Sequence, residues 1–155
     1  MDRASIVREE LDAGFNCAES IVAGFVNAIG APREAVLKAA TPFGAGIGRT
    51  GYVCGLVSGG AIVLGLAFGR TDPADEATKE RAYEHIAVLI REVKRSTGSI
   101  LCFDILGANL ADPEGRRRAL AVDLFRSRCR PVAVEVVGIL ERLLGSSTPT
   151  GRGQR

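Results

Sequence analysis

Residues 53–68 read VCGLVSGGAIVLGLAF, a run that contains no charged side chain. It lies inside a longer uncharged stretch, residues 50–69, whose 20 residues just reach the length of a membrane span. Six of these 20 residues are glycine, and only about 16 residues form a plausible helix, a length that suits a buried helix of a globular protein. The stretch therefore predicts a central buried helix and no membrane span.

Three glycines of this run, Gly55, Gly59 and Gly60, leave room for a second backbone to approach the helix closely. Such close packing is either internal to the chain or lies across the axis of a homodimer. The sequence does not decide between these two arrangements, so a homodimer remains one of the predictions.

A loop with glycine at every second position precedes the central helix, and residues 43–49 read FGAGIGR. The loop lacks the Gly-Lys-Ser/Thr ending of a phosphate-binding loop, and it follows a helix where a dinucleotide-binding loop follows a strand. We interpret it as a tight backbone turn that brings Cys54 close to its partners.

Apolar residues spaced by three and four predict helices on both sides of the central one. Their expected ranges, bounded by caps, prolines and glycines, are 3–13, 16–30, 32–40, 72–96, 100–106, a helix from 112, and a last helix from 131 to 144. The long helix is expected to begin at Asp72-Pro73 and to bury Tyr83, Ile86, Ala87, Ile90 and Val93. No segment alternates with period two, so the sequence predicts an all-α single domain of about six or seven helices over residues 1–145, with a disordered tail at 146–155.

Composition and charge place the chain among ordinary globular proteins, since 46% of its 155 residues are hydrophobic, 25% are charged and the net charge is +2. Acidic residues within the first 14 positions replace the apolar core of a secretory signal, which predicts a cytoplasmic location.

Arginines cluster at 116–118 and at 126, 128 and 130, where Asp112, Glu114 and Asp123 interleave with them. The overall balance of 20 basic and 18 acidic residues and the lack of an aromatic platform favour a solvated face over nucleic-acid binding. Docking of an acidic redox partner protein on these arginines is a weaker hypothesis.

Four cysteines, Cys17, Cys54, Cys102 and Cys129, are separated by 37, 48 and 27 positions and form no C-x-x-C motif. In a reducing cytoplasm they are ligands, reactive thiols or small buried hydrophobes. Each lies at or near a predicted helix start, where free N–H groups and the helix dipole lower the pKa of a thiol. This position favours a functional role over core filling.

Three kinds of site suit four such thiolates. A Cys₄ site holds tetrahedral zinc or an iron–sulfur cluster. Alternatively, two of the thiols cycle through a disulfide while the other two are structural. A third alternative has no redox role and is a structural zinc protein or a helical interaction module. The only histidine, His85, has no neighbouring ligand signature and is expected to be a surface or half-buried residue.

The motifs around the cysteines resemble the C_GCAxxG_C_C family of redox-active proteins over residues 5–144. They are Asn16-Cys17-Ala18, the glycine-rich loop followed by Cys54-Gly55-Leu56-Val57-Ser58-Gly59, and the single cysteines Cys102 and Cys129. Leu56 stands where the family has alanine.

The resemblance implies a redox-active protein, either an oxidoreductase or an electron carrier. A further similarity to the cluster-carrying part of split-Soret cytochromes implies an iron–sulfur cluster of the [2Fe–2S] type, held by Cys17, Cys54, Cys102 and Cys129, with zinc as the alternative. The haem part of that similarity does not apply, because the chain has no C-x-x-C-H motif.

Overall fold

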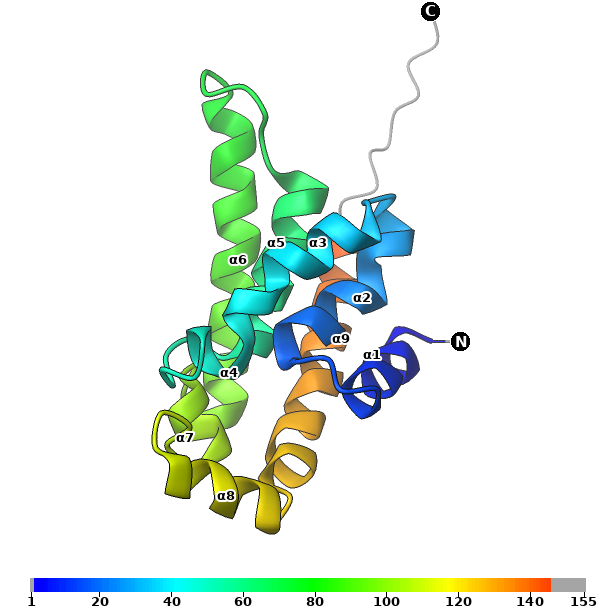
Figure 1. The fold of residues 1–155 in the computed structure, drawn as a ribbon. Coiled ribbons are helices and arrows are strands. Elements are labelled where there is room, and N and C mark those ends of the chain that lie inside the picture. The colour runs from blue at the N-terminus through cyan, green and yellow to red at the C-terminus, as the bar shows by residue number, and fades with distance from the viewer. Residues whose placement is uncertain (1, 146–155) are drawn as a thin grey trace, which may run out of the picture.

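The computed structural model describes residues 2–145, which form an all-α fold (Figure 1). Its elements are α1 (Arg3–Asp12), α2 (Cys17–Ile29), α3 (Arg33–Ala40), the 3₁₀ turn η1 (Thr41–Phe43), α4 (Gly44–Ile47), α5 (Gly55–Phe68), α6 (Glu76–Thr97), α7 (Cys102–Leu106), α8 (Pro113–Ala121), the π-helical turn η2 (Phe125–Cys129) and α9 (Arg130–Gly145). The predicted fold class is confirmed. Within the described residues the extended backbone pairs only at one bridge, between Val53 and Leu101. The tail predicted at 146–155 lies outside these residues.

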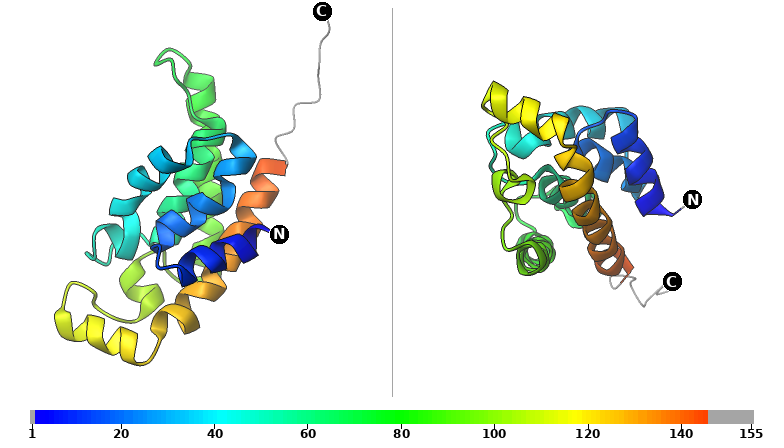
Figure 2. Two further views of the ribbon diagram at one scale, coloured as in Figure 1. Left: turned by 45° about the vertical axis from the view of Figure 1, so that its right-hand side comes forward. Right: turned by 90° about the horizontal axis from the view of Figure 1, so that it is seen from below.

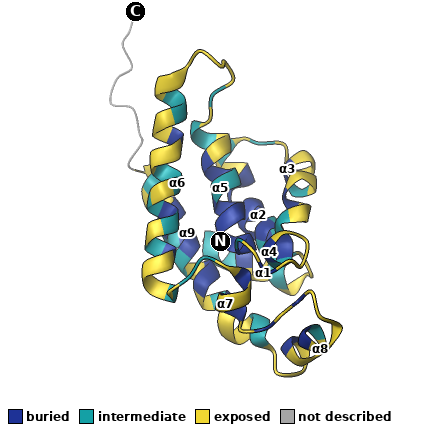
Figure 3. Ribbon diagram, turned by 90° about the vertical axis from the view of Figure 1, so that its left-hand side faces the viewer, coloured by how far each residue is buried: buried dark blue, intermediate teal, exposed yellow. Residues whose placement is uncertain are grey.

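The glycine-rich helix α5 lies at the centre of the fold, where α2, α6 and α9 pack around it (Figures 1 and 3). A Cβ atom on Gly59 would lie only 2.8 Å from the carbonyl oxygen of Ala18 in α2, and one on Gly60 would lie 2.8 Å from Cδ2 of Leu89 in α6. The close approach that these glycines allow is therefore internal to the chain. A homodimer stays a prediction.

Among residues 2–145, none of the helices has both the length and the apolar character needed to cross a membrane.

Short-range capping signals set the start of α2. The Asn16 side chain accepts hydrogen bonds from the N–H groups of Ala18 and Glu19, at 2.9 and 3.1 Å, and the Glu19 carboxylate accepts one from the Asn16 N–H at 2.8 Å. This capping box matches the sequence pattern, and Gly30 ends the helix in the left-handed conformation as predicted. Cys17 is thereby fixed as the first residue of α2.

The start of α6 and its buried face differ from the prediction. The helix begins at Glu76, because Asp75 caps it by accepting from the N–H of Thr78, whereas Asp72 forms a separate turn with the N–H of Ala74. The buried residues are Ala82, Leu89 and Val93, whereas Tyr83 is 60% exposed and Ala87 is also exposed. Val93 is buried as predicted, and Ile86 and Ile90 are half-buried against the core, so the predicted buried face is wrong only for Tyr83 and Ala87. Leu89, which was not predicted, packs at Gly60 of α5.

Candidate functional site

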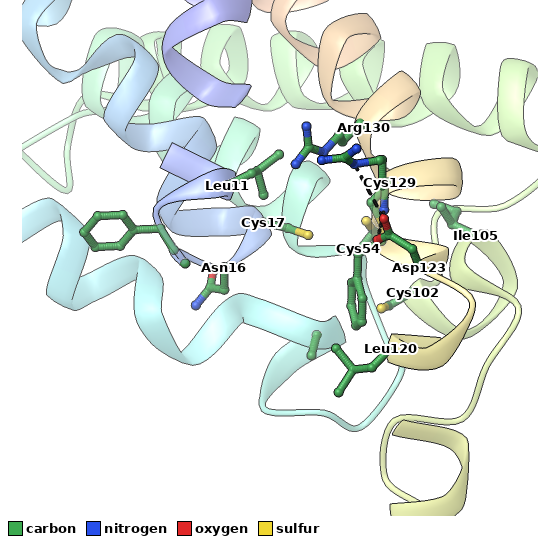
Figure 4. Close-up of a pocket in the computed structure, with 15 residues that line it drawn as sticks. Leu11, Asn16, Cys17, Cys54, Cys102, Ile105, Leu120, Asp123, Cys129 and Arg130 are labelled. Atoms are coloured by element: carbon green, nitrogen blue, oxygen red, sulfur yellow. Dashed lines mark hydrogen bonds and ion pairs between the residues drawn. The ribbon is translucent and has the colours of Figure 1, made fainter. Parts of the chain in front are cut away.

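The four cysteines come from four separate segments and line one cavity of about 430 Å³ (Figure 4). Other side chains that line it come from the α1–α2 junction, from α7 and from the α8–η2 segment, and they include Leu11, Phe15, Asn16, Ile105, Leu120, Asp123, Phe125, Arg126 and Arg130. Cys54, Cys102 and Cys129 are buried, and Cys17 is half-buried. The fold therefore gathers residues that are up to 112 positions apart in the sequence.

Cys17 and Cys54 form the wall of the cavity that faces the core, and glycine sets the distance between them. Cys17 is the first residue of α2, and Cys54 directly precedes α5. A Cβ atom on Gly55 would lie 3.0 Å from the Cβ of Cys17 and 3.1 Å from the N atom of Ala18. Gly55 thus lets the N-terminal ends of two long helices meet with both thiols at the cavity.

The wall of the cavity that carries Cys102 depends on an unusual turn at α4 (Gly44–Ile47). Ala45, Gly46, Ile47, Gly48 and Arg49 all have positive φ angles, between 55° and 71°. The N–H of Gly48 donates to the carbonyl of Gly44 at 3.0 Å, which closes one turn of left-handed helix. This conformation costs roughly 1–2 kcal/mol for each residue that is not glycine, and a branched residue such as Ile47 rarely adopts it. The structure therefore concentrates backbone strain beside the cysteines.

This left-handed turn seats Cys102. A Cβ atom on Gly46 would lie 2.6 Å from the Cβ of Cys102, so only glycine fits there. Beyond the turn, the Cys102 N–H donates to the carbonyl of Tyr52 at 2.7 Å, and the Cys54 N–H donates to the carbonyl of Ile100 at 2.8 Å. The loop was predicted to be a tight turn near Cys54, and it also positions Cys102.

Cys129 is the last residue of the π-helical turn η2, immediately before α9. Single π-helical turns contain one residue more than an α-helical turn and occur frequently at functional sites. Asp123, just upstream, has a φ angle of 47° and lines the same cavity. The α8–η2 connection is thus a second irregular segment that places a cysteine.

The arginines near Cys129 are directed to carboxylates. Arg126 forms an ion pair with Asp123 at 3.5 Å, and Arg130 forms one with Asp12 at the end of α1. These pairs compete with the thiols for positive charge. Carboxylates thus take up the positive charge of both arginines that line the cavity near Cys129.

The pKa values of three thiols are raised, which corrects the prediction that helix starts lower them. The Cys129 side chain, in hydrogen-bond contact with the Cys17 thiol, and burial together raise the pKa of Cys17 well above its usual value. Burial and the nearby Cys17 raise the pKa of Cys54 to about 12, and burial with Cys54 and Cys17 raises that of Cys102 to about 12. The N–H groups of Leu56 and Val57 do lower the pKa of Cys54, as a helix start should, but desolvation outweighs them.

His85 lies on α6, where its ring contacts that of Phe68 with 4.4 Å between centroids, and it is half-buried as expected. Within residues 2–145, no group of three or more His, Cys, Asp or Glu side chains is arranged to hold a metal ion.

A protein-family model described as "Putative redox-active protein (C_GCAxxG_C_C)" matches residues 15–143, which include all four cysteines of the cavity. The chain belongs to this family. The C_GCAxxG_C_C family is described as redox-active. The structure explains the glycines of its motif, because Gly55 and Gly59 leave room for α5 to pack closely against α2 beside Cys17. Neither the curated proteins nor the solved structures contain a match to the chain.

Sequence reasoning missed the residues that close the C_GCAxxG_C_C cavity from the solvent side. Leu11 and Phe15 reach it from the α1–α2 junction, and Leu120 and Phe125 reach it from the α8–η2 segment. Leu120 is 69% exposed although it is apolar, and an apolar residue among arginines was the available signal. These side chains make the cavity largely apolar.

Proposed function

We propose that the cavity binds one iron–sulfur cluster, of the [2Fe–2S] type, through Cys17, Cys54, Cys102 and Cys129, and that the protein carries single electrons. The observation that supports this most strongly is that four cysteines from four segments line a single cavity. Within residues 2–145 no three of them are yet gathered as a metal ion requires, so a bound cluster would have to draw the thiols together. Cysteine thiolates are the standard ligands of such clusters, and a cluster of this kind accepts and releases single electrons when it is bound.

The electrostatics of the cavity suit a cationic occupant. Burial is the main cause that raises the pKa of Cys54 and of Cys102, and the neighbouring cysteines raise both values further because like charges repel. The nearest arginines, Arg126 and Arg130, are paired with carboxylates. Positive charge inside the cavity would offset both the burial and the repulsion at Cys54 and Cys102, and the iron ions of a cluster would supply it.

The surrounding residues contribute two further properties. The N–H groups of Leu56 and Val57 act to lower the pKa of the Cys54 thiol and so favour negative charge there, which would raise the reduction potential of a bound cluster. The apolar side chains of Leu11, Ile105 and Phe125 restrict water. A buried site of this kind exchanges electrons while limiting hydrolysis and oxidation of its ligands.

Anaerobic purification tests the proposal. The expected product is coloured and contains iron and acid-labile sulfide in equal amounts, with a paramagnetic signal after reduction by dithionite. A colourless, iron-free protein that also fails to take up iron and sulfide on anaerobic reconstitution would contradict it.

Thiol–disulfide exchange between Cys17 and Cys129 is a second candidate, favoured by the hydrogen-bond contact of their side chains. In that reaction the two thiols lose two electrons and two protons and form a disulfide, while a disulfide of the partner is reduced to two thiols. Incubation in a series of glutathione redox buffers, with mass spectrometry of the linked peptides, measures it. Four thiols that stay reduced across the series would exclude this candidate.

A structural zinc ion remains the alternative metal, and metal analysis distinguishes it. One zinc per chain, together with unfolding when a chelator removes it, would favour zinc over both redox candidates. We also propose a cytoplasmic location, because the reducing cytoplasm keeps free thiols reduced and both proposed redox roles start from free thiols.

A further inference from the structure

An exposed surface beside the mouth of the cavity combines arginines with apolar side chains. We call it the α8–η2 surface and define it by Arg117, Arg118, Leu120, Val122, Arg126 and Arg128, all of which are exposed. Leu120 and Val122 are 69% and 61% exposed, although most apolar side chains of this size are buried in the fold. Exposed apolar residues surrounded by arginine are typical of protein-binding surfaces.

Positive charge is concentrated in this part of the chain. Between residues 113 and 130 there are six arginines and two carboxylates, a surplus of four positive charges in a chain whose net charge is +2. Arg117 and Arg126 pair with Glu114 and Asp123. Arg118 and Arg128 form no ion pair with any residue of 2–145, so their guanidinium groups are available to carboxylates of another molecule.

The position of the surface connects it to the cysteines. Leu120 and Arg126 belong to the surface and also line the cavity, and Arg128 directly precedes Cys129. Helix α8 lies at the periphery of the molecule in every view, with most of its residues exposed (Figures 2 and 3). A protein bound here would therefore cover the mouth of the cavity.

We infer that the α8–η2 surface is the docking site of an acidic protein. The inference that this protein is a one-electron carrier rests on the proposed function: the electron that the carrier's own centre loses is the electron that the four-cysteine site gains, and no covalent bond changes. Nucleic acid fits the surface less well, because the only aromatic ring of residues 113–130, Phe125, is half-buried, whereas the exposed Leu120 and Val122 suit the apolar contacts of a protein.

A binding experiment with an acidic probe tests the docking site. A fluorescent poly-glutamate peptide of about 20 residues is titrated with the full chain at about 20 mM and about 200 mM salt, and anisotropy is recorded. The test variant is Arg118→Gln with Arg128→Gln. The matched control is Arg81→Gln with Arg91→Gln, which removes two exposed arginines of α6 and changes the net charge equally.

The expected result is binding that weakens at high salt, at least fivefold weaker binding by the Arg118/Arg128 variant, and less than twofold change in the control. Equal weakening of both variants would overturn the inference, because it would show attraction to overall charge only. Two further probes are an oligothymidylate of about 20 nucleotides and vesicles that contain phosphatidylserine. The inference would also be overturned if either probe bound the parent chain more tightly than the peptide does and bound the Arg118/Arg128 variant more weakly. Two controls separate loss of charge from misfolding. The thermal melts of all variants are compared with that of the parent chain, and the double variant Arg118→Lys with Arg128→Lys, which keeps both charges, should still bind the peptide.

The outcome is independent of the cluster, since the peptide contains no redox centre. A chain that binds the peptide through Arg118 and Arg128 but never takes up iron would refute the proposed function and leave the docking surface standing. An iron-loaded protein that does not bind the peptide would refute the docking surface and leave the proposed function standing.

Discussion

The two walls of the four-cysteine cavity are built in opposite ways. Cys17 and Cys54 stand at the ends of α2 and α5, two regular helices whose contact is buried and allowed by glycine. Cys102 stands on a helix of five residues against a left-handed turn, and Cys129 ends a π-helical turn. The first wall, which we call the core wall, lies on two helices that supply many of the fully buried apolar side chains. The second, which we call the strained wall, is held by irregular backbone, although Cys102 and Cys129 are themselves buried.

This difference shows that the two pairs of cysteines are positioned by different physical effects. The core wall gains from buried apolar area, which makes its geometry costly to change. The other wall stores strain at Ala45, Ile47 and Arg49, all in the left-handed region. We expect substitutions in the two walls to lower the free energy of unfolding by different amounts and for different physical reasons.

The largest expected effect is in the strained wall, at Gly46. In Gly46→Ala the left-handed backbone costs about 1–2 kcal/mol, and the Cβ contact with Cys102 and with the Tyr52 backbone adds about 1–3 kcal/mol. Urea denaturation of the metal-free protein should thus show a loss of about 2–5 kcal/mol in the free energy of unfolding.

Gly48→Ala is the matched control for Gly46→Ala. Gly48 has a φ angle of 59°, close to the 69° of Gly46, but a Cβ atom there meets nothing within 4 Å. Its loss should be only about 1–2 kcal/mol. Equal losses at the two positions would mean that the turn does not seat Cys102.

In the core wall, Gly59→Ala tests the contact between α5 and α2. The new Cβ atom would lie 2.8 Å from the carbonyl oxygen of Ala18, and we expect a loss of about 1–3 kcal/mol in the free energy of unfolding. Gly65→Ala, in the same helix with nothing within 4 Å, should be neutral or stabilising by up to about 1 kcal/mol. A Gly59→Ala protein as stable as the Gly65→Ala protein would show that the helices are not in close contact.

The effect that is smallest at neutral pH, and grows only above pH 9, is the pH dependence of stability, which compares one thiol from each wall. Burial raises the pKa of Cys54 and of Cys102 from 9.0 to about 12, so both stay protonated in the folded chain while the unfolded thiols ionise. Their contribution to stability is complete below about pH 9 and is lost as the pH rises toward 12. Each thiol changes the free energy of unfolding by at most about 1.4 kcal/mol per pH unit in that window.

Denaturation of reduced, metal-free protein between about pH 7.5 and 10.5 measures this loss, and Cys54→Ala and Cys102→Ala should each make it shallower. A slope changed by Cys54→Ala alone would show that water reaches the strained wall, and a slope changed by neither would contradict the buried thiols.

The sequence predicted the regular part of the molecule because the signals there are local. Asn16 with Glu19, and Asp112 with Pro113, define helix starts within four residues, and the uncharged run at 53–68 can be buried only at the centre of a fold. The start of α6 was misplaced because Asp72 and Asp75 both suit a helix cap, and in the structure Asp72 accepts from the Ala74 N–H in a separate turn while Asp75 caps the helix.

The strained wall could not be predicted in the same way. A left-handed Ile47 contradicts its local preference. The segment is held by hydrogen bonds within the loop, such as that from the Tyr52 N–H to the Gly46 carbonyl, and by bonds to the distant residues Ile100, Cys102 and Phe103. The sign of the thiol pKa shifts was wrong for a related reason, because desolvation depends on the assembled cavity and not on the position of a cysteine in its helix. The four cysteines themselves were identified from the motif, and the cavity that joins them needed the fold.

The most direct test of the account is iron and sulfide analysis of five proteins reconstituted anaerobically: the parent chain and the variants Cys17→Ser, Cys54→Ser, Cys102→Ser and Cys129→Ser. If both walls supply ligands to one cluster, the parent chain binds about two iron and two sulfide per chain, and every variant loses most of both. Full iron and sulfide retained when Cys102 or Cys129 is replaced would contradict a shared site, and so would a parent chain that binds neither.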